Sequence, residues 1–406
     1  MDPQRADRLA ARAGVDIAYV ERLDELGILS TRDAEADLPG DERRIRVVVG
    51  LDRSGIPLDV LGHAIRGGSL SLDFIDQPNY DRFAGYTDRA FRALSDETRI
   101  PIDLLMFIRE AGGSARPQPD DLVREVELRV VPYIQVLLEA GVAPSSIERT
   151  LRVAGDGLRR LAETESDWWW KDILQPLFAR GLSAPEIGTL TERFATATGP
   201  VTDDALIALY HSQQTGNWMR NIFDVFEATL ERAGLHVRIE LPPAICFFDV
   251  TGYSRLTEER GDAAAADLAG RVARLVDRVS TERGGKPIKW LGDGVMVYFP
   301  EPRAAVLGAL DMLDRLARED LPPGHVGVAA GPVLFQEGDY FGRTVNAAAR
   351  IAAVATQDQV LVSRNVVDAV DLDGLVSFES IGPVELKGLL APLELFAARR
   401  VMTGPA

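Results

Sequence analysis

Two aspartates stand where carboxylates could gather metal ions. Asp249 comes near the end of the apolar run 244–250, and Asp293 lies between two glycines in a short turn that joins two further apolar runs. Carboxylates at a strand end and in a neighbouring turn can converge on hard cations such as Mg²⁺. Two such ions would activate an attacking hydroxyl and neutralise a triphosphate. Taken singly, each aspartate also fits a plain role, because Asp caps turns and Asp-Gly is common in hairpins.

A second candidate group lies in the segment 338–350. Asn346 and Arg350 are four residues apart, so they share one face if the segment is helical. Three alanines separate them, and such small side chains let a helix approach its neighbours closely. An arginine held in this way suits a phosphoryl group that gains negative charge. For these residues alone, a surface helix with a solvated arginine remains the alternative.

The elements that would position these residues begin after Gly234, where the sequence pattern changes. Strands are predicted where apolar residues alternate with polar ones or follow one another, at Val237–Ile239, 244–250 and 288–299. Gly292-Asp-Gly294 divides the last of these segments into the two strands of a hairpin. Further strands are predicted at 325–334, 359–362, 377–381 and 393–398, and helices at 263–281, 303–318 and 344–353. This order predicts an α+β domain over residues 235–406, with a mixed sheet, helices packed on it and a projecting hairpin.

Residues 1–215 predict an all-α domain, in which two subdomains could meet near 112–119. The helical segments are predicted at 18–29, 42–51, 58–64, 86–94, 103–109, 122–140, 146–163, 171–180 and 203–211. A linker helix follows over 216–234. Its apolar residues recur at helical spacing, which fits a seam between two chains as well as a single helix packed on its own domain.

The composition limits the classes of protein to which the chain can belong. Of the 406 residues, 46% are hydrophobic and 26% charged, as in globular proteins, and the length indicates more than one domain. The net charge of −17 argues against nonspecific binding to DNA or anionic membranes. Neither a signal peptide nor a membrane helix is predicted, so we expect a cytoplasmic protein. The single cysteine, Cys246, lies in an apolar run and is expected to be buried and inert.

Three blocks together resemble the signature motifs of the class III adenylate and guanylate cyclases. They are Phe248-Asp-Val-Thr-Gly-Tyr253, Lys289-x-x-Gly-Asp293 and Asp339-x-x-Gly-x-x-Val-Asn346-x-x-x-Arg350, in the order of the family. Glu385-Leu-Lys-Gly388, before the last strand, is similar to the end of the family's domain. The resemblance covers about 160 residues, and it implies the ferredoxin-like mixed sheet of these enzymes.

The resemblance also implies a role for each matching residue. Asp249 and Asp293, with the carbonyl of Val250, correspond to the ligands of two Mg²⁺ or Mn²⁺ ions. Lys289 and Asp339 correspond to the pair that recognises the purine.

In that pair, the lysine donates to the N1 edge of adenine and the aspartate accepts from its amino group, which favours ATP over GTP. Asn346 resembles the residue that orients the ribose, Arg350 the one that stabilises the transition state, and Lys387 a triphosphate contact. Pro332 stands where some members of the family have an arginine.

In this family the metal aspartates come from one subunit and the other site residues from its twin. The chain has one copy of each block, so the resemblance implies a homodimeric adenylate cyclase controlled by its N-terminal domain. A guanylate cyclase, or a nucleotide-binding transcription regulator, remains the alternative. The latter would use the segment 19–61, which loosely resembles MerR-type helix-turn-helix proteins.

Two features of the sequence do not decide which signal acts on the N-terminal domain. Asp167-Trp-Trp-Trp-Lys171 is predicted to pack in a core, with an apolar ligand site or a domain interface as the alternative. The four histidines, at positions 63, 211, 236 and 325, show no metal-ligand spacing and are expected to be satisfied or exposed. A small molecule, a lipid or pH could act on this domain.

Overall fold

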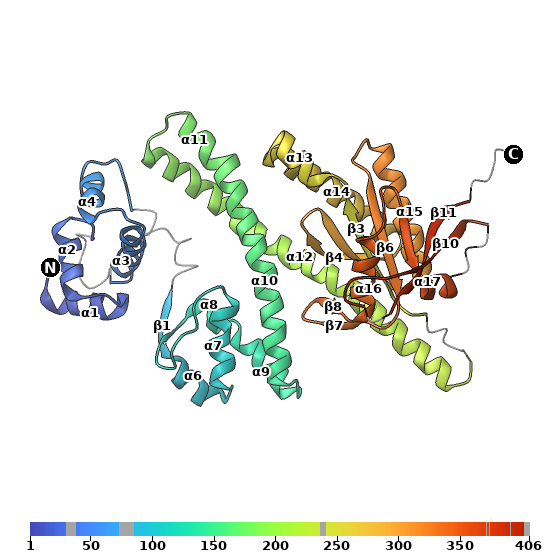
Figure 1. Ribbon diagram of the computed structural model, residues 1–406. Helices are drawn as coiled ribbons and strands as arrows, with labels where there is room; N and C mark the ends of the chain where they lie inside the picture. Colours follow the sequence, from blue (N-terminus) through green and yellow to red (C-terminus); the bar gives the residue numbers. More distant parts are fainter. Residues whose placement is uncertain are drawn as a thin grey trace. The chain divides into compact units, whose positions relative to one another are not determined.

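The computed structural model describes residues 1–29, 38–72, 85–235, 241–370, 372, 374–389 and 391–401. The chain divides into an N-terminal unit, Met1–Phe223, and a C-terminal unit, Asp224–Ala406. The long helix α12, Ala184–Arg232, continues from one unit into the other (Figure 1). The strand predicted at 237–239 falls outside the described residues. In the described part of the chain, no helix combines the length and apolar character needed to cross a membrane.

The first part of the N-terminal unit is a small bundle of helices. It contains α1 (Pro3–Ala13), α2 (Ile17–Glu25), α3 (Leu38–Arg53) and α4 (Leu58–Arg66). Helix α1 was not predicted; Asp2 caps its first turn, and Gly14 ends it in the left-handed conformation at φ 69°. Leu9, Leu23 and Ile45 are fully buried where these helices meet.

A second core follows at residues 85–151, and here two predicted helices are partly wrong. The segment 86–94 opens with strand β1 (Tyr86–Ala90) before α6 (Phe91–Thr98), and the segment 122–140 opens with β2 (Leu122–Arg124). The two strands pair antiparallel and form a small two-stranded sheet within the predicted helical domain. The remaining helices are α7 (Ile102–Ala111), α8 (Glu125–Leu128) and α9 (Val131–Glu139).

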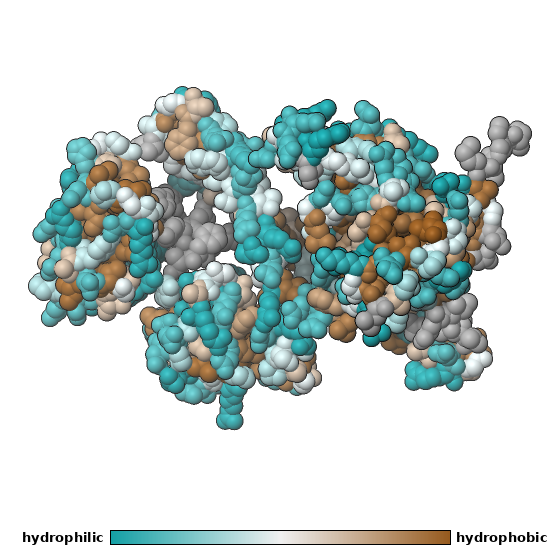
Figure 2. All heavy atoms as spheres, in the orientation of Figure 1, coloured by the Kyte–Doolittle hydropathy of each residue, from teal (hydrophilic) through white to brown (hydrophobic). Residues whose placement is uncertain are grey.

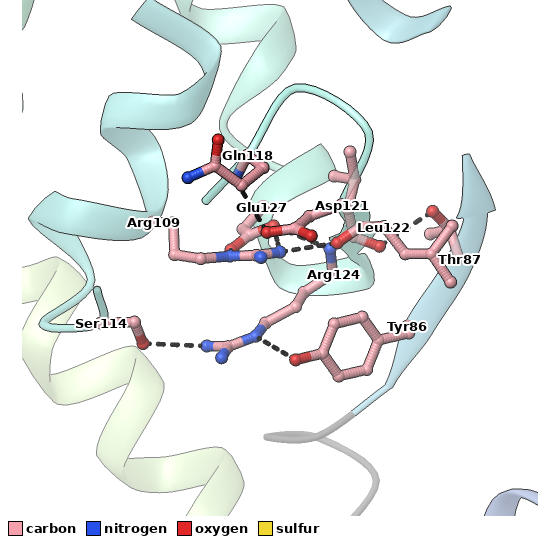
Figure 3. A network of polar contacts seen from close by, with 10 residues as sticks. Tyr86, Thr87, Arg109, Ser114, Gln118, Asp121, Leu122, Arg124 and Glu127 are labelled. Carbon is pink, nitrogen blue, oxygen red and sulfur yellow. Dashed lines mark hydrogen bonds and ion pairs between the residues drawn. The ribbon is translucent and has the colours of Figure 1, made fainter. Parts of the chain in front are cut away.

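A buried ion pair joins α7 to β2 and α8 (Figure 3). The Arg109 guanidinium donates from Nε and Nη2 to the two carboxylate oxygens of Glu127, at 2.7 and 2.8 Å, and also to the carbonyl of Leu122. The backbone N–H of Arg124 donates to Glu127 at 2.7 Å, which caps α8. Because both charges are buried and multiply hydrogen-bonded, losing either partner would leave an uncompensated charge in the core.

Helices α10 (Pro144–Trp168) and α12 are connected through a π-helix, Trp169–Leu174, and α11, Gln175–Ala179. The tryptophan cluster 168–170 was predicted to pack in a core, but in a single chain it does not, since Trp168 and Trp170 are 38% and 49% exposed. Trp168 and Trp169 instead contact Phe194 of α12. Helix α12 also runs through Pro200 without ending, and it merges the predicted helices 203–211 and 216–234 into one helix that ends at Arg232.

A seven-stranded mixed sheet forms the centre of the C-terminal unit, in the order β10-β11-β9-β6-β3-β5-β4. Its strands are β3 (Ala244–Val250), β4 (Lys286–Leu291), β5 (Gly294–Phe299), β6 (Gly324–Ala330), β9 (Val360–Ser363), β10 (Val376–Val384) and β11 (Leu393–Arg400). Only β6 and β9 pair in parallel within this sheet. The order β6-β3-β5-β4, with a helix between β3 and β4 and another between β5 and β6, is the predicted ferredoxin-like arrangement.

Helices cover both faces of this sheet. On one face Cys246 and Phe248 of β3 pack with α14 (Asp262–Glu282) and α15 (Pro302–Arg318). Cys246 is fully buried, as expected, and burial raises the pKa of its thiol to about 12. On the other face Ile245 packs with α16 (Arg343–Ala352). The connecting elements are α13 (Tyr253–Arg260), the hairpin β7 (Leu334–Gln336) and β8 (Asp339–Phe341), and α17 (Arg364–Ala369).

Helix α16 lies directly against strand β6, and a glycine makes this approach possible. A methyl group added at Gly327 would come within 2.1 Å of the Ala352 nitrogen and 2.6 Å of the Ala348 carbonyl oxygen. Ala348 is fully buried at this contact. The small residues between Asn346 and Arg350 therefore do what the sequence predicted, and they fix the height of α16 above the sheet.

Candidate active site

The two aspartates lie on adjacent parts of one sheet edge. Asp249 pairs with Gly294, the first residue of β5, and Asp293 directly precedes that glycine in the turn after β4. A side chain at position 294 would meet Asp249 Oδ1 at 3.2 Å, so glycine leaves room for the carboxylate. The predicted hairpin is confirmed and brings the two carboxylates together.

Their proximity shows in the electrostatics. Burial raises the pKa of Asp249 above its ordinary value, and the negative charge of Asp293 raises it further. His325 and the Val250 amide lower it in part; that amide donates to Asp249 Oδ1 at 3.1 Å. A half-buried carboxylate beside a second carboxylate would be stabilised by a nearby positive charge.

The donor set fits divalent cations that are shared with a substrate. Asp249, Asp293 and the carbonyl of Val250 are hard oxygen ligands, and a cation between the carboxylates would relieve their repulsion. Within the ranges that the structure describes, no cluster of three or more His, Cys, Asp or Glu side chains forms a complete metal cage. Mg²⁺ is often held by one or two carboxylates together with phosphate oxygens.

Lys289 and Asp339, 50 residues apart in sequence, form an ion pair. Lys289 Nζ on β4 donates to Asp339 Oδ2 on β8 at 2.5 Å, and the Tyr340 amide donates to the other carboxylate oxygen at 2.7 Å. Both side chains remain partly exposed, at 37% and 24%. The structure thus brings this predicted pair together, with polar atoms still accessible to a ligand.

The remaining predicted residues lie on the surface. Asn346 and Arg350 are both exposed on α16, while Ala348 between them faces the sheet. Lys387 is exposed in the connection between β10 and β11, next to the buried Leu386. Their side chains are free to meet a ligand, but no pairing among these three is described.

Strand register places Asp249 and Lys289 on the same face of the sheet. Lys289 lies opposite Met296, and Asp249 lies opposite Gly294, two residues earlier on the same strand. Residues directly opposite each other point to the same face, and so do residues two apart. Asp249 and Lys289 therefore both point to the face that α16 covers, where Met296 contributes to the core.

One residue near the site was missed. His325, the second residue of β6, lies opposite Asp249, with its Nε2 atom 3.8 Å from Asp249 Oδ2 and its Nδ1 atom 3.4 Å from Thr251 Oγ1. Its place depends on how β3 pairs with β6, and His325 follows Asp249 by 76 residues in sequence. Spacing alone gave no signal for it.

Comparison with known families identifies the chain. Residues 242–398 match the adenylate and guanylate cyclase catalytic domain, and residues 42–213 match the adenylate cyclase regulatory domain. The chain therefore belongs to the class III cyclases and is an enzyme of that class. The regulatory match begins within the segment 19–61 that loosely resembles MerR-type proteins.

Individual relatives align with this chain over different shares of their length. The pH-sensitive adenylate cyclase MT1302 of Mycobacterium tuberculosis (strain CDC 1551 / Oshkosh) is 28% identical over 320 residues, which are 77% of this chain and 78% of the relative. An adenylate cyclase of Streptomyces coelicolor is 27% identical over 59% of this chain and 60% of the relative. Among solved structures, the adenylyl cyclase CyaB from P. aeruginosa is 20% identical over 40% of this chain and 96% of that chain, with a TM-score of 0.36.

Proposed function

We propose that the chain is an adenylate cyclase that converts ATP to 3′,5′-cyclic AMP and pyrophosphate. The observation that carries the choice of ATP is the Lys289–Asp339 pair, because it offers a donor and an acceptor side by side. Adenine presents an acceptor at N1 and a donor at its amino group, whereas guanine presents the reverse. The relatives named adenylate cyclase support the same choice.

In this proposal each residue has one task. Two divalent ions, Mg²⁺ or Mn²⁺, would supply Lewis-acid chemistry to the 3′-hydroxyl and the triphosphate when held by Asp249, Val250 and Asp293. Asn346 orients the ribose, and Arg350 places its guanidinium on the phosphate as negative charge develops. Lys387 contacts the triphosphate. We assign no residue as a general base, so the 3′-hydroxyl proton passes to water or to the substrate.

We further propose that the active site is shared between two copies of the chain. Figure 2 shows apolar surface over the sheet of the C-terminal unit, and Leu291, Leu334 and Phe335 are more than half exposed. Such a surface fits a face that a second copy covers.

Helix α12 offers a second surface for this homodimer. Among the side chains described between residues 148 and 235, Ile187 is the only buried large apolar one. Meanwhile seven large apolar residues near the end of α12 are 44–64% exposed: Trp218, Met219, Ile222, Phe223, Val225, Phe226 and Leu230. At 100° per residue they share one broad face, and the opposite side carries Asp224, Glu227 and Glu231. A linker helix of this kind would pair with its twin and join the regulatory domains to the catalytic domains.

Phe226→Arg should therefore dissociate the dimer. An arginine in the middle of the apolar face would be buried without a partner, so we expect the dimer dissociation constant to rise about 100-fold or more, with loss of activity at low concentration. Sedimentation across a dilution series measures this. Glu231→Arg places the same residue on the opposite side of α12 and should leave assembly unchanged. Equal assembly of both variants would show that this face is not the dimer interface.

Regulation by the N-terminal unit is part of the same proposal. The match to the adenylate cyclase regulatory domain supports it, and α12 provides a continuous connection to the C-terminal unit. A small molecule, a lipid or pH could be the input. The name of the M. tuberculosis relative makes pH the first of these to test.

The direct test of the activity is a product assay on the full chain. With Mg²⁺ or Mn²⁺ present, we expect cyclic AMP from ATP with a kcat/KM at least about tenfold above that for cyclic GMP from GTP, since one mismatched hydrogen-bonding edge costs on the order of 1–3 kcal/mol. A preference for GTP would make the chain a guanylate cyclase. A chain that stays inert toward both nucleotides with Mn²⁺ present would refute the proposal.

A further inference from the structure

A lysine outside the predicted site is surrounded by aromatic rings. Lys286 is the first residue of β4, and its ammonium nitrogen lies 5.5 Å from the centre of the Tyr298 ring, 5.7 Å from that of Phe335 and 5.4 Å from that of Tyr340. A cation within about 6 Å of a ring centre is attracted by the electron-rich face of the ring. The three rings come from β5, β7 and β8, so this one charge contacts three strands.

The rings also contact one another. Tyr298 and Tyr340 stack with centroids 4.4 Å apart and planes inclined by 13°, and Phe335 lies 5.0 Å from Tyr340. Tyr298 belongs to the seven-stranded sheet, whereas Phe335 and Tyr340 belong to the separate hairpin β7–β8. Lys286 and the stacked rings therefore fasten this hairpin to the β4–β5 edge of the sheet.

This fastening lies immediately beside the purine-recognition pair. Lys286 precedes Lys289 by three residues on β4, with an irregularity in the β4–β5 pairing between Pro287 and Lys289. Tyr340 follows Asp339, and its amide donates to the Asp339 carboxylate. Because Lys289 and Asp339 stand on two different hairpins, the distance between them depends on how firmly these hairpins are held together.

We propose that Lys286, Tyr298, Phe335 and Tyr340 form a positioning cluster that sets the spacing of Lys289 and Asp339 and thereby the preference for adenine over guanine. This inference rests on the proposed adenylate cyclase function. Lys286 is a positioning residue and touches no substrate. If the β7–β8 hairpin shifts, Lys289 and Asp339 no longer match both groups of the adenine edge at once. The preference for ATP over GTP then falls before the capacity for turnover is lost.

Lys286→Met tests the cluster, because methionine keeps an unbranched apolar side chain and removes the charge. We expect the ratio of kcat/KM for ATP to that for GTP to fall about tenfold, mainly through a higher KM for ATP, as the loss of cation–π contacts to several rings implies. Lys286→Arg keeps a cation that stacks on aromatic rings and should retain the ratio within about threefold. Thermal unfolding of each variant shows whether the fold is kept.

A second variant tests the same inference if the Lys286→Met protein fails to fold. Phe335 is 57% exposed, so Phe335→Leu should fold normally while it removes one ring of the cluster. We expect a smaller fall in the same ratio, about threefold. An unchanged ratio in a folded Lys286→Met or Phe335→Leu protein would overturn the inference, and so would equal losses with both nucleotides. A wild-type chain that forms no cyclic AMP would instead remove the proposed function, and the inference with it.

Discussion

Asp249→Asn is expected to abolish turnover while the protein stays folded. The substitution keeps the shape of the side chain and removes one of two carboxylates that would hold the divalent ions. We expect kcat to fall about a thousandfold or more, since the ions would neutralise the triphosphate and activate the attacking hydroxyl. Cyclic AMP formation under saturating ATP and Mn²⁺ measures the effect. Appreciable activity in this variant, or in Asp293→Asn, would remove the metal assignment.

The pKa of Asp249 explains why this variant should fold. Burial and the Asp293 charge raise the pKa of Asp249 above the unfolded value of about 3.9. A raised carboxyl pKa contributes stability that is full below the unfolded pKa and is lost as pH rises through the folded pKa. At pH 7 without metal, the Asp249 charge therefore opposes folding, and Asp249→Asn should have a Tm at or above that of the wild type.

Metal addition gives an independent readout of the same site. Divalent ions that bind the folded state should raise the Tm of the wild type and leave that of Asp249→Asn nearly unchanged. Asp267→Asn on α14 is a matched control, because Asp267 is exposed and lies outside the site. This control should keep both the activity and the metal response. A Tm gain of equal size in all three proteins would place the ions elsewhere.

Much of the catalytic fold could be predicted because local signals agreed with the tertiary structure. Gly292-Asp-Gly294 forms the hairpin, and the apolar run 244–250 is a strand buried at the centre of the sheet. The N-terminal unit was harder. Residues 86–90 and 122–124 become strands only because they pair with each other across more than 30 residues, and this pairing leaves no periodic signal in either segment.

Helix α12 shows a different limit of sequence reasoning. Pro200 and Gly216 usually interrupt helices, so two shorter helices were predicted where one 49-residue helix is found. In the same way, the three tryptophans were predicted to lie in a core because aromatic residues are mostly buried. Whether an apolar helix face packs within its own chain or against a twin depends on the assembly, and a single sequence does not encode that choice in its periodicity.

The candidate site also contains residues that local sequence signals could predict and residues that they could not. Asp249 and Asp293 could be paired in advance, because a strand end and an adjacent hairpin turn are local features. The Lys289–Asp339 contact followed from the family resemblance. Lys286 and its three rings gave no sequence signal, since residues 286, 298, 335 and 340 share no motif and meet only when the β7–β8 hairpin lies against β4 and β5.

Mixing two inactive variants should restore part of the activity if the site is shared. Asp249→Asn damages the metal-binding half, and Arg350→Ala damages the half that we assign to the opposite subunit. A mixed dimer would have one site with both defects and one intact site. Because half of the dimers are mixed in an equal mixture, about a quarter of wild-type activity should return after subunits exchange. Separately tagged chains, purified through both tags, confirm that mixed dimers are present.

The matched control combines two defects of the same half. In a mixed dimer of Asp249→Asn and Asp293→Asn chains, each site receives a damaged pair of metal ligands, so no activity should return. Recovery in the first mixture and none in the second would follow directly from a site composed of two subunits. Purified mixed dimers of Asp249→Asn and Arg350→Ala that stay inactive would instead mean that each chain carries a complete site of its own, and the exposed Arg350 of α16 would then need another role.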